Sequence, residues 1–294
     1  MARIAFFAQV RETAEMIKIS HSVFALPFAL AAAALALRTG DGGWSWNKIA
    51  WIVFCAVTAR TAAMAQNRLV DARLDAVNPR TAARALPSGR VTRGFVIGLV
   101  IFASALFVFG AGQLNRLCLY LSPVALLVVL GYPYAKRFTV HCHVWLGLAL
   151  GLSPVGAWVA VRGAFVDMAT PILMAMAVTF WAAGFDLIYA CQDADHDRKR
   201  GLFSIPVRLG VAGALRLSVA LHVLCILFLV AIYAVNPHVG WLYGVGLAAA
   251  VALLVYEHAI VTPQDLSRVD LAFFTLNGLV SLVLGAVMIA DAFL

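Results

Sequence analysis

Long apolar stretches restrict what this chain can fold into more than any other feature. Runs long enough to cross about 30 Å of hydrocarbon occur nine times, near residues 17–37, 49–66, 94–113, 117–134, 143–162, 171–191, 211–235, 239–257 and 270–293. The chain is 63% hydrophobic and only 12% charged, whereas soluble domains are about 45–50% apolar and about 25% charged. We therefore expect an all-α integral membrane protein of about nine transmembrane helices. The breaks at Asn115-Arg116 and Asn236-Pro237 are short, and each is also compatible with a kink inside one longer helix.

The basic residues indicate how the spans are oriented. If the N-terminus is cytoplasmic, 17 Lys and Arg residues fall on the cytoplasmic side and 4 on the other, with Arg60 inside the second span. This asymmetry follows the positive-inside rule and predicts a cytoplasmic N-terminus, with the C-terminus on the other side of the membrane. The net charge of +8 does not indicate nucleic-acid binding, because the cations lie between apolar runs and not on a soluble domain. The first run lacks a cleavage site of the usual kind, so we expect no removed signal peptide.

The domain organisation follows from the same runs. No soluble domain fits between them, so residues 1–294 are expected to form a single transmembrane domain. Two acidic clusters emerge on the same predicted side, after the second and the sixth span. Their equivalent positions four spans apart suggest a pseudo-repeat of spans 1–4 and 5–8 with a ninth helix added. Five scattered cysteines, none in a C-x-x-C pair, indicate neither a disulfide framework nor a metal site.

The first acidic cluster is Asn67, Asp71 and Asp75, spaced i, i+4 and i+8. If the second helix continues through them, their side chains project from one face, one turn apart. Carboxylates at that spacing repel each other and are costly at a membrane edge unless a cation or a water-filled cavity receives them. The second cluster comprises Asp186, Tyr189, Asp193, Asp195 and Asp197. We expect the fold to bring the two clusters together.

Such a site suits a hard divalent cation. Mg²⁺ prefers oxygen ligands and usually binds through one or two carboxylates plus substrate phosphates. Basic residues that could clamp an anion lie on the same predicted side: Arg80, Arg84, Lys136 and Arg137. Acidic residues for a metal beside basic residues for oxygen anions predict a site for a diphosphate ester, whose apolar tail would lie between the helices.

These segments resemble motifs of the UbiA superfamily of membrane aromatic prenyltransferases over most of the chain. The first motif is Asn67-x-x-x-Asp71-x-x-x-Asp75, followed by the stretch that begins Arg80-Thr81-Ala82-Ala83-Arg84. The second is Asp186-x-x-Tyr189-x-x-x-Asp193-x-x-x-Asp197, and Gly131-Tyr132-Pro133-Tyr134-Ala135-Lys136-Arg137 lies between the two. The stretch from Lys18 to Phe28 is similar to the opening of the 4-hydroxybenzoate polyprenyltransferase branch. One departure is Arg68, because many members have Asn-Asp at the start of the first motif.

The resemblance implies a UbiA-type fold with helices around a central cavity and transfer of a polyprenyl chain from its diphosphate to an aromatic acid. Asp71, Asp75, Asp193 and Asp197 would hold Mg²⁺ on the diphosphate with Asn67 in support, and Arg80, Arg84, Lys136 and Arg137 would bind it. Asp186 and Tyr189 would line the acceptor side or orient the carboxylates. 4-Hydroxybenzoate, for ubiquinone, is the acceptor that the branch suggests, and a hydroxylated naphthoate, for menaquinone by the futalosine-type route, is the alternative.

Other interpretations remain beside these. An ion-coupled transporter also places carboxylates among helices, although here the acids cluster at one membrane face and no pair of broken helices is evident. Asp195 lies off the i, i+4 face and serves a solvated role or a metal role equally well. We interpret His141 and His143, which flank Cys142 at the start of a span, as interfacial, and Glu257 and His258 at the end of the eighth span likewise. The sequence leaves the oligomeric state open.

Overall fold

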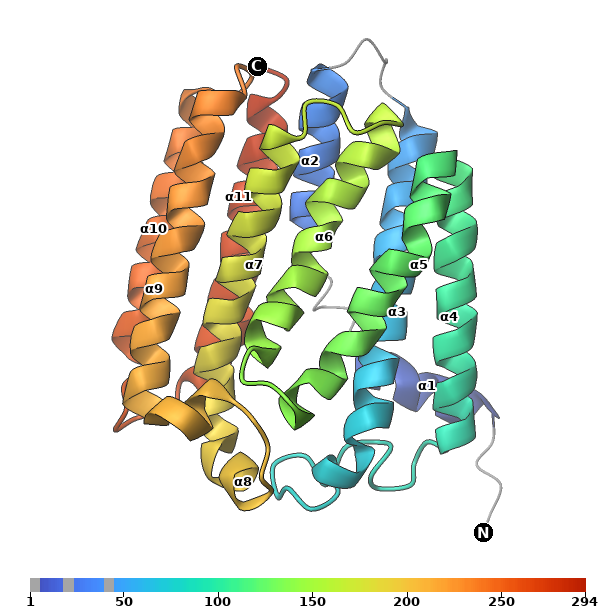
Figure 1. Ribbon diagram of the computed structural model, residues 1–294, viewed down its shortest axis with the longest axis vertical. Helices are drawn as coiled ribbons and strands as arrows, with labels where there is room; N and C mark the ends of the chain where they lie inside the picture. Colours follow the sequence, from blue (N-terminus) through green and yellow to red (C-terminus); the bar gives the residue numbers. More distant parts are fainter. Residues whose placement is uncertain (1–5, 18–23, 40–44) are drawn as a thin grey trace.

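Helices make up the whole regular structure of this protein in the parts that its computed structural model describes, which are residues 6–17, 24–39 and 45–294. Long helices lie side by side in one bundle (Figure 1). In chain order they are α1 (Phe6–Ile17), α2 (Leu26–Arg38), α3 (Trp46–Asp75), α4 (Arg93–Leu114), α5 (Arg116–Gly131), η2 (Tyr132–Arg137), α6 (Cys142–Arg162), α7 (Ala169–Ala190), η3 (Cys191–Asp193), α8 (Ala194–Lys199), α9 (Ile205–Val235), α10 (Trp241–Ile260), η4 (Leu271–Leu276) and α11 (Asn277–Asp291).

The predicted membrane spans match these helices closely. Eight helices are long and apolar enough to cross a bilayer, and α2 is a shorter apolar helix within the first predicted span. Residues 18–23, where the resemblance to the 4-hydroxybenzoate branch begins, lie outside the described residues. The expectation of an all-α protein with about nine apolar helices is therefore confirmed.

Both short breaks between spans separate two helices. Asn115 has an extended backbone between α4 and α5, and its side-chain oxygen accepts from the Cys118 backbone N–H at 2.8 Å. The Asn115 amide also donates to the carbonyls of Val159 and Ala160 on α6, at 3.0 and 3.2 Å. One side chain thus caps α5 and satisfies carbonyls of a neighbouring helix, which explains how the chain turns within a single residue.

The helix α7 lies at the centre of the bundle and packs against both α6 and α9. Its Trp181 and Phe185 are buried against Phe24 and Phe28, with ring centroids 5.0–6.3 Å apart. These aromatic contacts form the middle of the largest core cluster, which extends over α2, α6, α9, α10 and α11. The core therefore holds the second acidic motif, at the end of α7, in a fixed position relative to the other helices.

The contact between α6 and α7 depends on two glycines one turn apart. A Cβ atom at Gly147 would lie 2.1 Å from the Thr179 carbonyl oxygen, and one at Gly151 would lie 2.6 Å from the Ala175 carbonyl oxygen. Small residues spaced by four let helix backbones approach closely inside a membrane. Any larger residue at either position must push the two helices apart.

One end of the bundle carries all the predicted site loops. Figure 1 shows the connection after α3, the turn of η2, and α8 together at the end of the bundle where α1 lies, and the C-terminus at the opposite end. The helix α3 continues without interruption through Asp75, as the spacing of the first motif required. Asn67, Asp71 and Asp75 consequently occupy successive turns of one helical face.

One expectation about this end of the bundle is wrong. Glu257, expected at the interface, is 0% exposed and lies inside the bundle, where it accepts a hydrogen bond from Asn277. Near the end of an apolar helix, an acidic residue can face water or a neighbouring helix. Helical periodicity does not distinguish these two cases, because both place the acid in the last turns of an apolar run.

The glycine contact leads to a stability prediction. We expect Gly147→Ala to lower the free energy of unfolding by about 1–3 kcal/mol, because the new methyl group overpacks against a backbone carbonyl that cannot rotate away. Gly156→Ala is the matched control on the same helix, since nothing lies within 4 Å of its added Cβ. Thermal unfolding of both variants in the same detergent measures the difference, and equal melting temperatures would contradict the close contact.

Candidate active site

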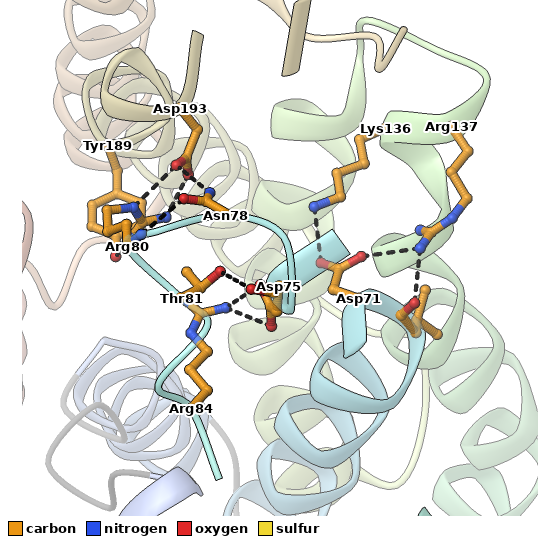
Figure 2. A network of polar contacts seen from close by, with 11 residues as sticks. Asp71, Asp75, Asn78, Arg80, Thr81, Arg84, Lys136, Arg137, Tyr189 and Asp193 are labelled. Carbon is orange, nitrogen blue, oxygen red and sulfur yellow. Dashed lines mark hydrogen bonds and ion pairs between the residues drawn. The ribbon is translucent and has the colours of Figure 1, made fainter. Parts of the chain in front are cut away.

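The two acidic motifs and the predicted basic residues meet at the lower end of the bundle. Figure 2 shows Asp71 and Asp75 from α3, Asp193 from η3, and cations from two connecting segments in one network of polar contacts. Residues more than 100 positions apart in sequence bond directly in this network. The structure therefore brings the two clusters together, although the carboxylates face cations and not each other.

Asp71 pairs with both cations of η2. The Lys136 ammonium lies 2.9 Å from Asp71 Oδ2, and Arg137 Nη2 lies 3.2 Å from Oδ1. The Arg137 guanidinium also donates to the backbone carbonyls of Val70 and Pro133, at 2.9 and 2.8 Å. Arg137 is thus hydrogen-bonded to the backbone of both elements, whereas Lys136 forms an ion pair with Asp71 alone among the residues that the structure describes.

Asp75 pairs with a single arginine from the connection after α3. Arg84 Nη1 lies 2.8 Å from each carboxylate oxygen of Asp75. The Thr81 hydroxyl donates to the Asp75 backbone carbonyl at 3.1 Å, which holds this connection against the helix end. Arg68, the departure from the family pattern, lies partly buried beside this pair, and the charges of Asp75 and Arg84 both act on it.

Asp193 is held by Arg80 and Asn78. Arg80 donates through Nε to Asp193 Oδ1 at 3.0 Å and through Nη2 to Oδ2, while Asn78 Nδ2 donates to Oδ1 at 3.0 Å. Arg80 Nη1 also donates to the Tyr189 hydroxyl at 2.7 Å, and the guanidinium lies over the Tyr189 ring. Partial burial alone would lower the pKa of Arg80, but the hydrogen bond to Asp193 and its negative charge outweigh it and raise that pKa above its ordinary value.

Three further predicted site residues lie around this network. Asn67 is half-buried one turn before Asp71, and its side chain has no hydrogen bond within the described ranges. Asp197 is half-buried in α8, where the charges of Lys136 and Asp193 act on it, and it forms no ion pair with any described residue. Asp186, by contrast, has a partner that the sequence did not indicate.

That partner is His143, which we had interpreted as interfacial. His143 is only 4% exposed, and its Nδ1 lies 2.7 Å from Asp186 Oδ2, so the interfacial interpretation is wrong for this residue. The two positions lie 43 residues apart on α6 and α7. Asn78 was also missed, although Asn-Pro before Arg80 is a signal for a turn: its side-chain oxygen accepts from the Arg80 backbone N–H at 3.0 Å and so orients the arginine.

These residues fit a Mg²⁺-diphosphate better than a bare metal ion. Within the described residues there is no group of three or more His, Cys, Asp or Glu side chains that could hold a metal. Mg²⁺ does not require such a group, because it commonly uses one or two carboxylates with substrate phosphates and water as its other ligands. Each of the three paired carboxylates contacts a cation that could instead contact a phosphate oxygen. The carboxylates would then be available to the metal and the cations to the diphosphate.

An apolar cavity of about 270 Å³ opens among α2 to α6 beside this network. Its α3 wall includes Ala56, Arg60, Ala63 and Met64, on the same helical face as Asn67. Tyr132, the first residue of η2, lines the cavity and is close enough to Asp71 and Asp186 for their charges to act on it. The cavity therefore lies in the membrane-spanning part of the bundle and approaches the acidic motifs at Met64 and Tyr132.

Among the described residues that line this cavity, Arg60 is the only Lys, Arg, Asp or Glu. Its Nε and Nη2 are buried, and neither has a hydrogen-bond partner in the described parts of the chain. A buried guanidinium without an anion is costly in an apolar site. The sequence placed Arg60 within a span but gave it no role, although a lone charge inside an apolar run is itself a signal for a functional position.

Comparison with known proteins identifies relatives along most of the chain. Residues 25–279 match the sequence model of the UbiA prenyltransferase family. A 4-hydroxybenzoate octaprenyltransferase of Cupriavidus necator is 32% identical over 79% of this chain and 80% of that protein, and one of Methylobacillus flagellatus is 30% identical over 85% and 84%.

Solved structures show the same architecture. The apo structure of a UbiA homolog from Aeropyrum pernix K1 has a TM-score of 0.84 and 34% identity, covering 93% of this chain and 98% of that one. A UbiA homolog from Archaeoglobus fulgidus, bound to DMAPP and Mg²⁺, has a TM-score of 0.72 over 96% of this chain and 98% of that one, at 19% identity. The predicted fold class is confirmed by these similarities.

The geometry around Arg80 predicts that lysine cannot replace it. We expect Arg80→Lys to lower the free energy of unfolding by about 1 kcal/mol, because a point-like ammonium cannot bond both Asp193 oxygens and Tyr189 at once. Arg73→Lys provides the control, since Arg73 is exposed near the end of α3. Chemical unfolding of both variants in one detergent would show the difference, and an Arg80→Lys protein as stable as the control would refute the three-way contact.

Proposed function

Because this chain belongs to the UbiA prenyltransferase family, we propose that it transfers a polyprenyl chain from a polyprenyl diphosphate to 4-hydroxybenzoate, with Mg²⁺ as the cofactor, in quinone biosynthesis. The observation that carries this proposal is the alternation of carboxylates and cations beside an apolar cavity. Such a site offers ligands for a metal, partners for a diphosphate and space for an isoprenoid chain. The relatives named as 4-hydroxybenzoate octaprenyltransferases support the choice of acceptor.

The paired residues can take up a Mg²⁺-diphosphate without creating an uncompensated charge. Lys136, Arg84 and Arg80 would release their carboxylates and donate to phosphate oxygens, while Asp71, Asp75 and Asp193 become free for the metal. Asp197 and Asn67, which have no ion pair or side-chain hydrogen bond of their own within the described ranges, would add ligands from each motif. Bound Mg²⁺ would neutralise charge on the diphosphate as the allylic carbon–oxygen bond breaks.

The remaining chemistry depends on the position of the aromatic acid. The carbon–oxygen bond breaks and its electron pair leaves with the diphosphate. The allylic carbon then bonds to a ring carbon beside the phenol, and that ring carbon gives its proton to a base. Arg80, Arg84 and Lys136 would stabilise the departing diphosphate because they already point into the site. The apolar walls of the cavity exclude water from the allylic cation before the ring reacts with it.

Arg60 is the residue best suited to hold the acceptor's carboxylate. Its guanidinium lines the cavity, has two buried nitrogens without partners among the described residues, and lies on the α3 face that carries the first motif. A carboxylate would supply the missing acceptors through two parallel hydrogen bonds. A hydroxylated naphthoate also carries a carboxylate and a phenol, so it remains the alternative acceptor of the same chemistry.

The bacterial relatives and the distribution of basic residues support a location in the inner membrane. The end that carries the two acidic motifs would face the cytoplasm, where a water-soluble metal and an aromatic acid are available, and the C-terminus would face the periplasm. The isoprenoid chain would reach the cavity from the bilayer.

The central prediction concerns the motif aspartates. We expect Asp71→Asn and Asp193→Asn each to reduce Mg²⁺-dependent prenyl transfer at least about 100-fold, because an amide cannot replace a charged ligand of the metal-bound diphosphate. The measurement is the rate of product formation from a polyprenyl diphosphate and 4-hydroxybenzoate in purified membranes, with product mass determined.

Asp195→Asn is the matched control. Asp195 lies between Asp193 and Asp197 in sequence, but it is exposed and pairs with Arg198 on its own helix. Its substitution should leave the rate within about two-fold, since exposed ion pairs contribute little. Near-wild-type turnover of either Asp71→Asn or Asp193→Asn would contradict the two-motif site.

A second prediction separates the acceptor from the donor. Arg60→Gln should raise the KM for the aromatic acid at least about 10-fold, the loss expected when a charged hydrogen bond is removed, and leave the KM for the polyprenyl diphosphate unchanged. The same assay run with a hydroxylated naphthoate identifies which acceptor the wild-type protein prefers. An increase confined to the diphosphate KM would assign Arg60 to the donor instead. Arg162→Gln, at the far end of α6, serves as the control.

A further inference from the structure

A buried acid outside the candidate site calls for a physical explanation. Glu257, near the end of α10, is 0% exposed; its Oε1 accepts from Asn277 Nδ2 at 2.9 Å, and its Oε2 is buried without a hydrogen-bond partner in the described residues. Neither the proposed metal site nor the cavity includes it. Acidic residues inside membrane helices are costly and commonly functional.

Asn277 connects Glu257 to two other parts of the bundle. Its Nδ2 also donates to the Ala272 backbone carbonyl at 2.9 Å, and its Oδ1 accepts from the Trp181 indole N–H at 2.6 Å. Both amide hydrogens and the amide oxygen are therefore used, in a residue that is itself 0% exposed. This arrangement fixes the Asn277 amide between α10, α7 and the turn that precedes α11.

That turn is the π-helix η4, Leu271–Leu276. A π-helical turn widens the backbone and weakens its own hydrogen-bond pattern, and such turns are frequent at functional sites. Here the Asn277 side chain bonds a carbonyl of the widened turn from outside. The Glu257–Asn277 pair thus stabilises the π-helical conformation of this turn, which differs from that of an α-helix.

The widened turn carries Phe273, whose ring meets the second acidic motif. The Phe273 centroid lies 4.3 Å from that of Tyr189 and 5.1 Å from that of Phe185. Tyr189 in turn accepts a hydrogen bond from Arg80 at 2.7 Å, and Arg80 holds Asp193. Glu257 is therefore linked through Asn277 to the Ala272 carbonyl of the turn. The next residue, Phe273, contacts Tyr189, which accepts from Arg80.

We propose that Glu257 is a positioning residue for the diphosphate site: with Asn277 it holds the π-helical turn that places Phe273 behind Tyr189, and so fixes Tyr189 and Arg80. It acts through these contacts and touches no substrate. The expected effect on diphosphate binding rests on the proposed function. The contacts themselves do not depend on which aromatic acceptor is used.

The test compares Glu257→Leu with Glu257→Gln. Leucine removes the acceptor for Asn277, so we expect the affinity for a polyprenyl thiodiphosphate in the presence of Mg²⁺ to fall about 10-fold, the effect of about 1.4 kcal/mol. Hydrogen exchange of the backbone in residues 189–199 should also become faster. Glutamine keeps an oxygen acceptor, and this variant should retain wild-type affinity and exchange.

Asp291→Leu is the matched control for a lost buried acid. Asp291 is 8% exposed and accepts from the Gly240 backbone N–H at the opposite end of the bundle. It should destabilise the protein without changing diphosphate affinity or exchange in residues 189–199. If Glu257→Leu behaves like Asp291→Leu in both measurements, Glu257 has only a structural role and the proposal is overturned.

Phe273→Leu tests the same series of contacts if Glu257→Leu does not fold. It leaves the buried acid in place and removes the ring behind Tyr189, so it should weaken thiodiphosphate binding and loosen residues 189–199; unchanged values for both would refute the inference. Hydrogen exchange needs no substrate. If the wild-type protein bound no prenyl diphosphate, the proposed function would be refuted. The exchange data would still show whether Glu257 positions residues 189–199.

Discussion

The structure depends on pairing three motif aspartates, Asp71, Asp75 and Asp193, with cations at the edge of an apolar bundle. An uncompensated carboxylate there would be strongly disfavoured, and three near one another would also repel. Lys136 and Arg137 compensate Asp71, Arg84 compensates Asp75, and the partner of Asp193 is an arginine from the loop that follows α3. Ion pairs therefore hold these acidic side chains in place. Under the proposed function, the same cations would become diphosphate ligands as their carboxylates take up Mg²⁺.

The rest of the fold serves to hold these pairs in position and to supply space beside them. Close contact at Gly147 and Gly151 brings α6 against α7, which places the second motif opposite the end of α3. The cavity among α2 to α6 lies along the α3 face that bears Asn67 and Asp71, so under the proposed function one substrate could place its diphosphate at the motifs and its isoprenoid chain in the cavity. The unpartnered guanidinium of Arg60 in the cavity wall supports the proposal of an acidic acceptor.

Much of this could be predicted from the sequence because it follows from local periodicity. Apolar runs located the spans, and the i, i+4 spacing placed Asp71 and Asp75 on one helical face. The pairing of particular partners could not be predicted, since Asp193 and Arg80 lie 113 residues apart and their contact depends on how the helices pack. The bond between His143 and Asp186 could not be predicted for the same reason. The π-helical turn could not be predicted either, because its apolar residues resemble those of an ordinary helix, and neither could the burial of Glu257 against Asn277.

The measurement that tests this account most directly is a calorimetric titration of the purified wild-type protein with a non-reactive polyprenyl thiodiphosphate at increasing Mg²⁺ concentrations. If cations and carboxylates exchange partners as described, metal and diphosphate must bind together, each strengthening the other at least about 10-fold, because binding linkage is reciprocal. Tight thiodiphosphate binding that stays the same when Mg²⁺ is removed with a chelator would contradict the exchange of partners and the metal-dependent site built on it.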